Sequence, residues 1–123
     1  MDHGKSRGFI IRGGRRAAGL RYDTHMTSRE ALRRLNHNRE RLRTHHVRHI
    51  AVFGSTARDQ ATVHSDVDLL VEFEPGAPVG LFAYVRLLDF LSDVMGTRID
   101  LATPGALRPE MRDEIVTEAV RAF

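Results

Sequence analysis

Two aspartates, Asp66 and Asp68, open a run of alternating acidic and apolar residues that predicts a strand over residues 66–73. Alternate side chains of a strand share a face, so both carboxylates are expected to point the same way, while the apolar residues between them point into a core. Two unit charges about 4 Å apart repel by roughly 4 kcal/mol at an effective dielectric of 20. Such a pair is usually held ionised by cations, so it predicts a metal-binding site.

A Gly-Ser turn, Gly54 and Ser55, ends an earlier apolar run, and ten residues separate it from Asp66. We expect a short helix to begin at Ser55, with the serine as its N-cap. The backbone N–H groups and the positive dipole end at a helix start attract phosphate. An anion-binding turn followed by paired carboxylates indicates a metal-dependent enzyme that acts on nucleotides.

A third carboxylate, Asp100, lies between Ile99 and Leu101 in a predicted strand over residues 98–102. A carboxylate buried alone in such a strand is costly. We therefore expect Asp100 to lie on a strand beside the one that carries Asp66 and Asp68. Three carboxylates and a phosphate-binding turn are the components of two-metal phosphoryl or nucleotidyl transfer.

The elements expected to position these residues follow the order α-β-α-β-α-β-α, which describes an α/β (α+β) domain with a small mixed β-sheet flanked by helices. The predicted ranges are helix 28–44, strand 47–53, a short helix from 55, strand 66–73, helix 79–95, strand 98–102 and helix 106–122. Apolar spacing predicts that the last helix turns inward Leu107, Met111, Ile115, Ala119 and Val120.

The 123 residues predict one domain, without cysteine and without a stretch long enough to span a membrane, and a cytoplasmic location is the simplest expectation. Residues 1–25, rich in glycine and basic residues, have no apolar periodicity and are interpreted as a disordered tail that holds no core position. The domain is then expected over residues 26–123. Residues 1–48 carry a net charge of +9 and the remainder −6. The basic third either attracts RNA, nucleotide phosphates or an acidic partner, or is an Arg-rich solvated face.

The motif around the carboxylates resembles that of the minimal nucleotidyltransferase (MNT) group of the DNA polymerase β superfamily. The group's pattern is Gly-Ser-x-Ala-Arg followed by Ser-Asp-x-Asp-Leu, and Asp100 matches its third carboxylate. The matching positions are Gly54, Ser55, Ala57, Arg58, Ser65, Asp66, Asp68 and Leu69. The similarity extends from about residue 27 to the end and implies the nucleotidyltransferase fold. Asp59 stands where glycine is common, and His64 precedes the Ser-Asp pair.

The resemblance implies that Asp66 and Asp68 hold two Mg²⁺ ions that bridge the triphosphate of ATP. It implies that Asp100 completes one metal site and helps to activate the acceptor hydroxyl. An alternative is structural: Asp66 caps the start of the strand and Asp68 pairs with Arg98.

The same resemblance implies that Ser55 and the amides after Gly54 bind the terminal phosphates, with Ser65 also at the nucleotide. Arg58 lies three residues after Ser55, on the same helical face, and is expected to steady phosphate charge. The alternative for Arg58 is a structural salt bridge.

MNT proteins typically accompany a HEPN-domain ribonuclease toxin, for which they are the antitoxin. The resemblance therefore implies transfer of AMP from ATP to a tyrosine hydroxyl of such a toxin. A chain of this size has no second domain to hold the acceptor, so a protein partner that brings its own hydroxyl is expected. Two alternatives remain: an antitoxin that inhibits by binding alone, and an RNA-binding module, which the acidic remainder of the chain disfavours.

Overall fold

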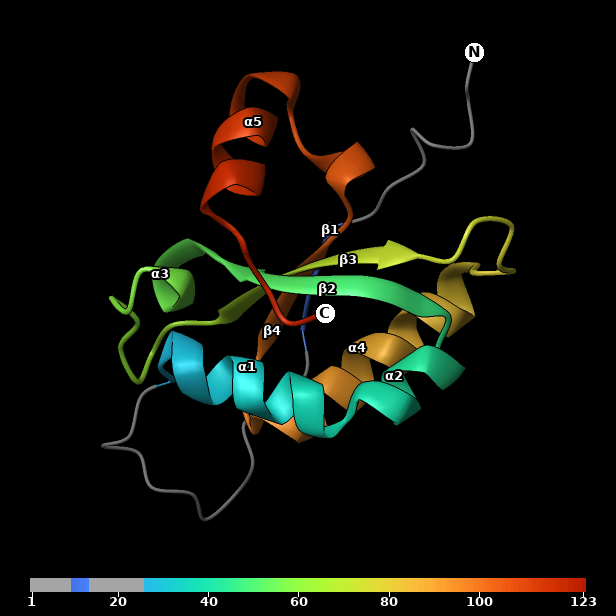
Figure 1. The fold of residues 1–123 in the computed structure, drawn as a ribbon, viewed down its shortest axis with the longest axis horizontal. Helices are drawn as coiled ribbons and strands as arrows, with labels where there is room; N and C mark the ends of the chain where they lie inside the picture. Colours follow the sequence, from blue (N-terminus) through green and yellow to red (C-terminus); the bar gives the residue numbers. More distant parts are fainter. Residues whose placement is uncertain (1–9, 14–25) are drawn as a thin grey trace.

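A five-stranded mixed sheet forms the centre of the protein (Figure 1). The structure, a computed structural model, describes residues 10–13 and 26–123. The strand order is β1-β4-β3-β2-β5, in which β3 and β4 are parallel and the other neighbouring pairs are antiparallel. The strands are β1 Ile10–Gly13, β2 Val47–Phe53, β3 Val67–Phe73, β4 Ile99–Ala102 and β5 Val120–Arg121. The predicted mixed sheet is confirmed, and its three central strands lie within one residue of the predicted ranges.

Helices cover the two faces of the sheet unequally (Figure 1). Three helices lie on one face: α1 Ser28–His37, α2 Arg39–Thr44 and α4 Leu81–Met95. On the opposite face lies α5 Pro109–Glu118, and the four-residue α3 Gly54–Ala57 directly follows β2. The first face is the larger core, in which alternate residues of β3 share one apolar cluster with α1, α2 and α4, and we call it the helix face. The face under α5 is called the site face.

The predicted helix over 28–44 is two helices. Thr27 caps the first, since its hydroxyl accepts a hydrogen bond from the Glu30 N–H at 3.1 Å. The break falls at Asn38, whose side-chain amide donates to the Arg34 carbonyl at 2.8 Å. A side chain that bonds to the backbone of the preceding turn competes with helix continuation, which accounts for the division.

The C-terminal segment also differs from its prediction as one helix over 106–122. A 3₁₀ turn, Pro104–Ala106, precedes α5, and after Ala119 the chain extends into β5 beside β2. Leu107 is buried as predicted, but Met111 is 45% exposed and Val120 is 38% exposed. Val120 could not belong to a helical stripe, because pairing with β2 ends the helix before it.

Part of the predicted disordered tail is a strand. Ile10–Gly13 forms β1, which pairs antiparallel with β4, and Ile11 packs against the main core. The interpretation as a tail without core positions is therefore wrong for these four residues. The rest of that segment, residues 1–9 and 14–25, lies outside the described residues.

The helix predicted over 79–95 is confirmed as α4, and Gly96 ends it in the left-handed conformation, with φ of 71°. Glycine adopts this conformation without the steric cost that a Cβ atom brings. Among the described residues, none of the helices combines the length and apolar character needed to cross a membrane.

Candidate active site

Asp68 and Asp100 lie side by side on adjacent parallel strands. The register of β3 and β4 pairs Asp68 with Asp100, and Val67 and Leu69 with Ile99 and Leu101. Those four apolar residues are buried at 1% exposure or less, whereas both aspartates are only partly buried. Alternation along each strand therefore turns both carboxylates to the site face. This juxtaposition was predicted from the sequence and is confirmed.

The backbone of Gly54 lies in close contact with the carboxylate of Asp68. The glycine has a φ of +71°, and a Cβ atom at this position would overlap Oδ2 of Asp68. Phe53, the residue before it, pairs with Asp68 across β2 and β3. Two separate constraints, the left-handed backbone and the close approach of the carboxylate, thus require glycine here. The first residue of the predicted phosphate-binding turn is in contact with the predicted metal ligand.

Asp66 lies one residue before β3, and its side chain is 22% exposed. Its Oδ1 lies 3.8 Å from Nε of Arg98. The alternative pairing of Arg98 with Asp68 is thus not the one that the structure contains. A cation beside Asp66 reduces the repulsion among the carboxylates of this edge.

No preformed cage for a metal ion exists among the described residues: no group of three or more His, Asp or Glu side chains there is arranged to hold one. Asp66, Asp68 and Asp100 come from neighbouring positions of one sheet edge, but their carboxylates do not close around a common point. The chemistry of the donors, carboxylate oxygens, is nevertheless that preferred by Mg²⁺.

The turn at Ser55 differs in detail from the prediction. Helix α3 begins at Gly54, so Phe53 occupies the N-cap position, without a side-chain capping hydrogen bond. Ser55 is therefore the second residue of the helix and not its N-cap. A single four-residue turn has only a small dipole, since the dipole grows by alignment of successive peptide units. Phosphate binding by Ser55 and the backbone N–H groups of this turn stays a prediction.

Arg58 forms an ion pair. Its Nη1 lies 2.7 Å from Oε2 of Glu118, at the end of α5, and its Nε donates to Oε1 of Gln60 at 3.0 Å. The structural salt bridge considered as the alternative is thus present. Glu118 is 60 residues away in sequence, and no pattern in the sequence signals the pairing.

Ser65 organises the loop that leads to Asp66. Its hydroxyl accepts a hydrogen bond from the Thr62 N–H at 2.9 Å, and its own N–H donates to the Thr62 carbonyl at 3.0 Å. These bonds fix the backbone immediately before the first carboxylate. In this structure Ser65 shapes the loop beside the carboxylates.

Tyr84, in α4, lies near the site and was not among the predicted site residues. Its hydroxyl donates to the Leu101 carbonyl at 3.2 Å, and its side chain is 1% exposed. Burial raises the pKa of the Tyr84 phenol, and the negative charge of Asp100 raises this pKa further. Tyr84 therefore remains neutral beneath the strand that carries Asp100 and adds no negative charge to the site.

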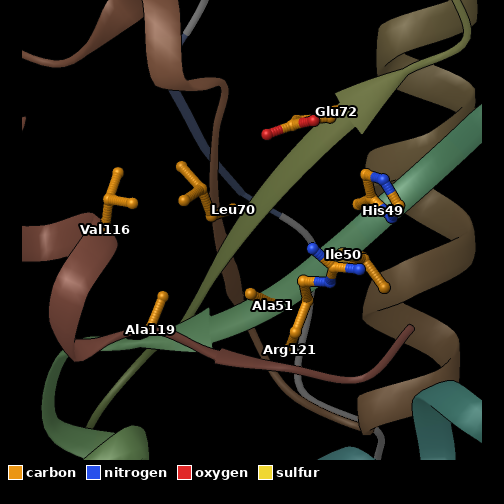
Figure 2. A pocket seen from close by; sticks show the side chains of 8 residues that line it. All are labelled: His49, Ile50, Ala51, Leu70, Glu72, Val116, Ala119 and Arg121. Atoms are coloured by element: carbon orange, nitrogen blue, oxygen red, sulfur yellow. The ribbon is translucent and has the colours of Figure 1, made fainter.

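A separate pocket of about 230 Å³ lies further along the sheet (Figure 2). Figure 2 shows apolar side chains of α5 and β3, Val116 and Leu70, at one side of it and His49 and Glu72 at the other. None of the predicted site residues lines this pocket. The carboxylate site and the pocket are therefore different places in the fold.

The match to a family agrees with this geometry. The family described as "Nucleotidyltransferase domain" matches residues 32–122, which include the Gly-Ser turn and all three carboxylates. The chain belongs to the nucleotidyltransferase family. A solved structure described as "Structure of putative minimal nucleotidyltransferase" superposes on this nucleotidyltransferase with a TM-score of 0.66 and 33% identity, and covers 79% of this chain and 97% of that one.

Curated relatives of this nucleotidyltransferase are named as protein adenylyltransferases. "Protein adenylyltransferase MntA" of Thermococcus cleftensis is 36% identical over 84 residues, which are 68% of this chain and 83% of that protein. "Putative protein adenylyltransferase MJ0435" of Methanocaldococcus jannaschii is 40% identical over 76 residues, which are 62% of this chain and 80% of that protein. The expected resemblance to minimal nucleotidyltransferases is confirmed.

Proposed function

We propose that this nucleotidyltransferase transfers AMP from ATP to a tyrosine hydroxyl of a partner protein, a HEPN-type ribonuclease toxin, and thereby acts as its antitoxin. The observation that carries the proposal is the pairing of Asp68 with Asp100 on parallel strands, with Gly54 against the Asp68 carboxylate. The names of the relatives support AMP as the group transferred and a protein as its acceptor. The type of partner follows from the resemblance to MNT antitoxins.

The donor set fits Mg²⁺. This ion is usually bound by one or two carboxylates together with substrate phosphates, and it keeps several waters, so it needs no closed cage of protein ligands. Asp66, Asp68 and Asp100 would hold it, which is compatible with side chains that do not converge before the nucleotide binds. Bound there, Mg²⁺ would neutralise charge on the phosphates as the reaction proceeds.

The proposed step forms one bond and breaks one. The tyrosine oxygen of the partner bonds to the α-phosphorus of ATP, the bond from that phosphorus to the bridging oxygen of the β-phosphate breaks, and pyrophosphate leaves. Asp100 accepts the hydroxyl proton. Backbone N–H groups of the Gly54–Ser55 turn and the guanidinium of Arg58 bind the terminal phosphates, which hold the leaving group in place.

Charge on the surface supports an acidic partner. Helices α1 and α2 carry five exposed arginines: Arg29, Arg33, Arg39, Arg41 and Arg43. Of these, Arg33 pairs with Glu30 at 2.7 Å, and the guanidinium groups of Arg39 and Arg43 lie over the Phe123 ring. Exposed positive charge of this kind speeds the approach of an acidic surface, and the effect weakens as salt screens exposed charges.

The test is intact-mass spectrometry of the partner after incubation with ATP and Mg²⁺. The wild-type chain should add AMP, and the double substitution Asp66→Asn, Asp68→Asn should slow the addition by at least about a hundredfold. Substitution of a residue that only hydrogen-bonds to a metal ligand already costs up to about a hundredfold, so loss of two ligands should cost at least as much. Asp93→Asn, an exposed aspartate on α4, is the matched control and should transfer at the wild-type rate. Inhibition of the toxin by both chains without a mass change would instead identify an antitoxin that acts by binding alone.

A further inference from the structure

The ion pair between α3 and α5 joins the Gly-Ser turn to the last helix of the chain. Arg58 ends α3 and its backbone N–H bonds to the Gly54 carbonyl at 3.2 Å, so its position follows that of the turn. The guanidinium has two anchors, Glu118 at 2.7 Å and Gln60 at 3.0 Å. A guanidinium has five N–H donors, so these contacts leave donors for a further anion.

Glu118 is well placed to hold a fixed position, because α5 is held both by apolar packing against the sheet and by hydrogen bonds to the preceding turn. Ile115 and Ala119 pack against the cluster that covers the site face. Arg112 of the same helix donates to the Pro104 and Leu107 carbonyls, at 3.2 and 3.0 Å, which binds α5 to the turn before it. The Glu118 carboxylate is 26% exposed, less than the 46% of its partner. The carboxylate is thus the more buried member of the pair.

We propose that Glu118 is a positioning residue, which holds the Arg58 guanidinium at the phosphate side of the site before the nucleotide arrives. The inference rests on the proposed function, in which Arg58 binds the triphosphate. An arginine that is half exposed at the end of a four-residue helix samples many rotamers, and ordering it on binding reduces affinity. Contact with an anchored carboxylate removes much of that freedom in advance. A purely structural role, in which the pair only joins α5 to α3, predicts lost stability without lost phosphate binding.

The experiment measures the affinity of the full chain for inorganic triphosphate with Mg²⁺ by titration calorimetry, alongside KM and kcat for ATP. Glu118→Ala should weaken triphosphate binding by about fivefold. This is the lower end of the change in affinity that one site typically produces at another. The loss should appear in KM for ATP more than in kcat, because the phosphates are bound before the step and during it. Glu118→Asp, which keeps the charge, should recover part of the loss.

Two controls make the outcome decisive. Glu114→Ala removes an exposed carboxylate one turn earlier on α5 and should bind triphosphate as the wild type does. In an Arg58→Ala background, Glu118→Ala should have no further effect on binding, because the residue on which it acts is gone. Equal affinity of the Glu118→Ala and Glu114→Ala chains, or the same loss without Arg58, would overturn the inference. A wild-type chain that binds triphosphate but transfers no AMP to protein would refute the proposed function alone.

Discussion

The two faces of the sheet share the same strands but serve different purposes. On the helix face Val67, Leu69 and Val71 of β3 are at most 1% exposed and pack in a large apolar cluster under α1, α2 and α4. On the site face the residues between them are Asp68, Leu70 and Glu72, of which only Leu70 is buried. Figure 1 shows α5 over this second face. Burial of the first set stabilises the fold and allows the site face to carry the polar, partly exposed side chains of Asp68 and Glu72.

The largest effect is expected from a single methyl group on the site face. Gly54→Ala brings a Cβ atom onto the Asp68 carboxylate and forces alanine into a φ of +71°. A displacement of about 1 Å at a reacting group can reduce the rate about a hundredfold, so AMP transfer should fall by that order. Gly76→Ala is the matched control, since its φ is +77° but nothing lies within 4 Å of the added atom. Equal transfer rates of the two variants would show that the contact with Asp68 is unimportant.

A pair of adjacent leucines compares the stability of the two faces. Leu69→Ala removes a side chain with 0% exposure from the large cluster and should lower the free energy of unfolding by about 2–5 kcal/mol. Leu70→Ala, at 8% exposure in the small cluster under α5, should cost less, because the open side can relax around the gap. Urea unfolding of the two variants is the measurement. A larger loss for Leu70→Ala would reverse the assignment of the main core.

Removal of β1 tests whether this N-terminal strand contributes to the apolar core on the helix face. Deletion of residues 1–25 should lower the free energy of unfolding by on the order of 1–2 kcal/mol, because Ile11 is lost from the core and β4 loses its outer partner. Thermal melting gives the comparison with a deletion of residues 1–9, which retains β1 and should melt close to the full chain. If both deletions melted alike, β1 would add nothing to stability.

The smallest effect is expected at Tyr84, on the helix face beneath the strand that carries Asp100. Tyr84→Phe removes the hydrogen bond to the Leu101 carbonyl and should cost about 1 kcal/mol. In the wild type the phenol pKa is raised in the folded state, so the unfolded chain loses this proton first. The stability that Tyr84 provides is complete below its ordinary pKa of 10.0 and declines as pH rises above it. The wild-type stability should therefore fall above pH 10 more steeply than that of Tyr84→Phe, which an unfolding series in alkaline buffers would measure.

Local patterns in the sequence were sufficient for the three central strands and for the carboxylates. Alternation of acidic and apolar residues places Asp66 and Asp68, and the apolar neighbours of Asp100 place it in a strand, because a side-chain period of two is a property of the strand itself. The Gly-Ser turn follows from residue type in the same way. The predicted helix over 79–95 ends at Gly96 because a left-handed residue there is a local requirement.

The tertiary structure determined which distant segments meet. Nothing near Arg58 in sequence indicates Glu118, and nothing in the N-terminal segment indicates that Ile10–Gly13 would pair with β4. The end of the last helix was likewise set by the free edge of β2, which the chain joins as β5. The spacing of apolar residues indicates whether a segment is a helix or a strand. It does not indicate which distant segment pairs with a strand edge or forms an ion pair, because that depends on which segments the tertiary fold brings together. The sequence alone therefore determined the carboxylates of the site, and the packing of α5 and β1 around them was decided only by the assembled sheet.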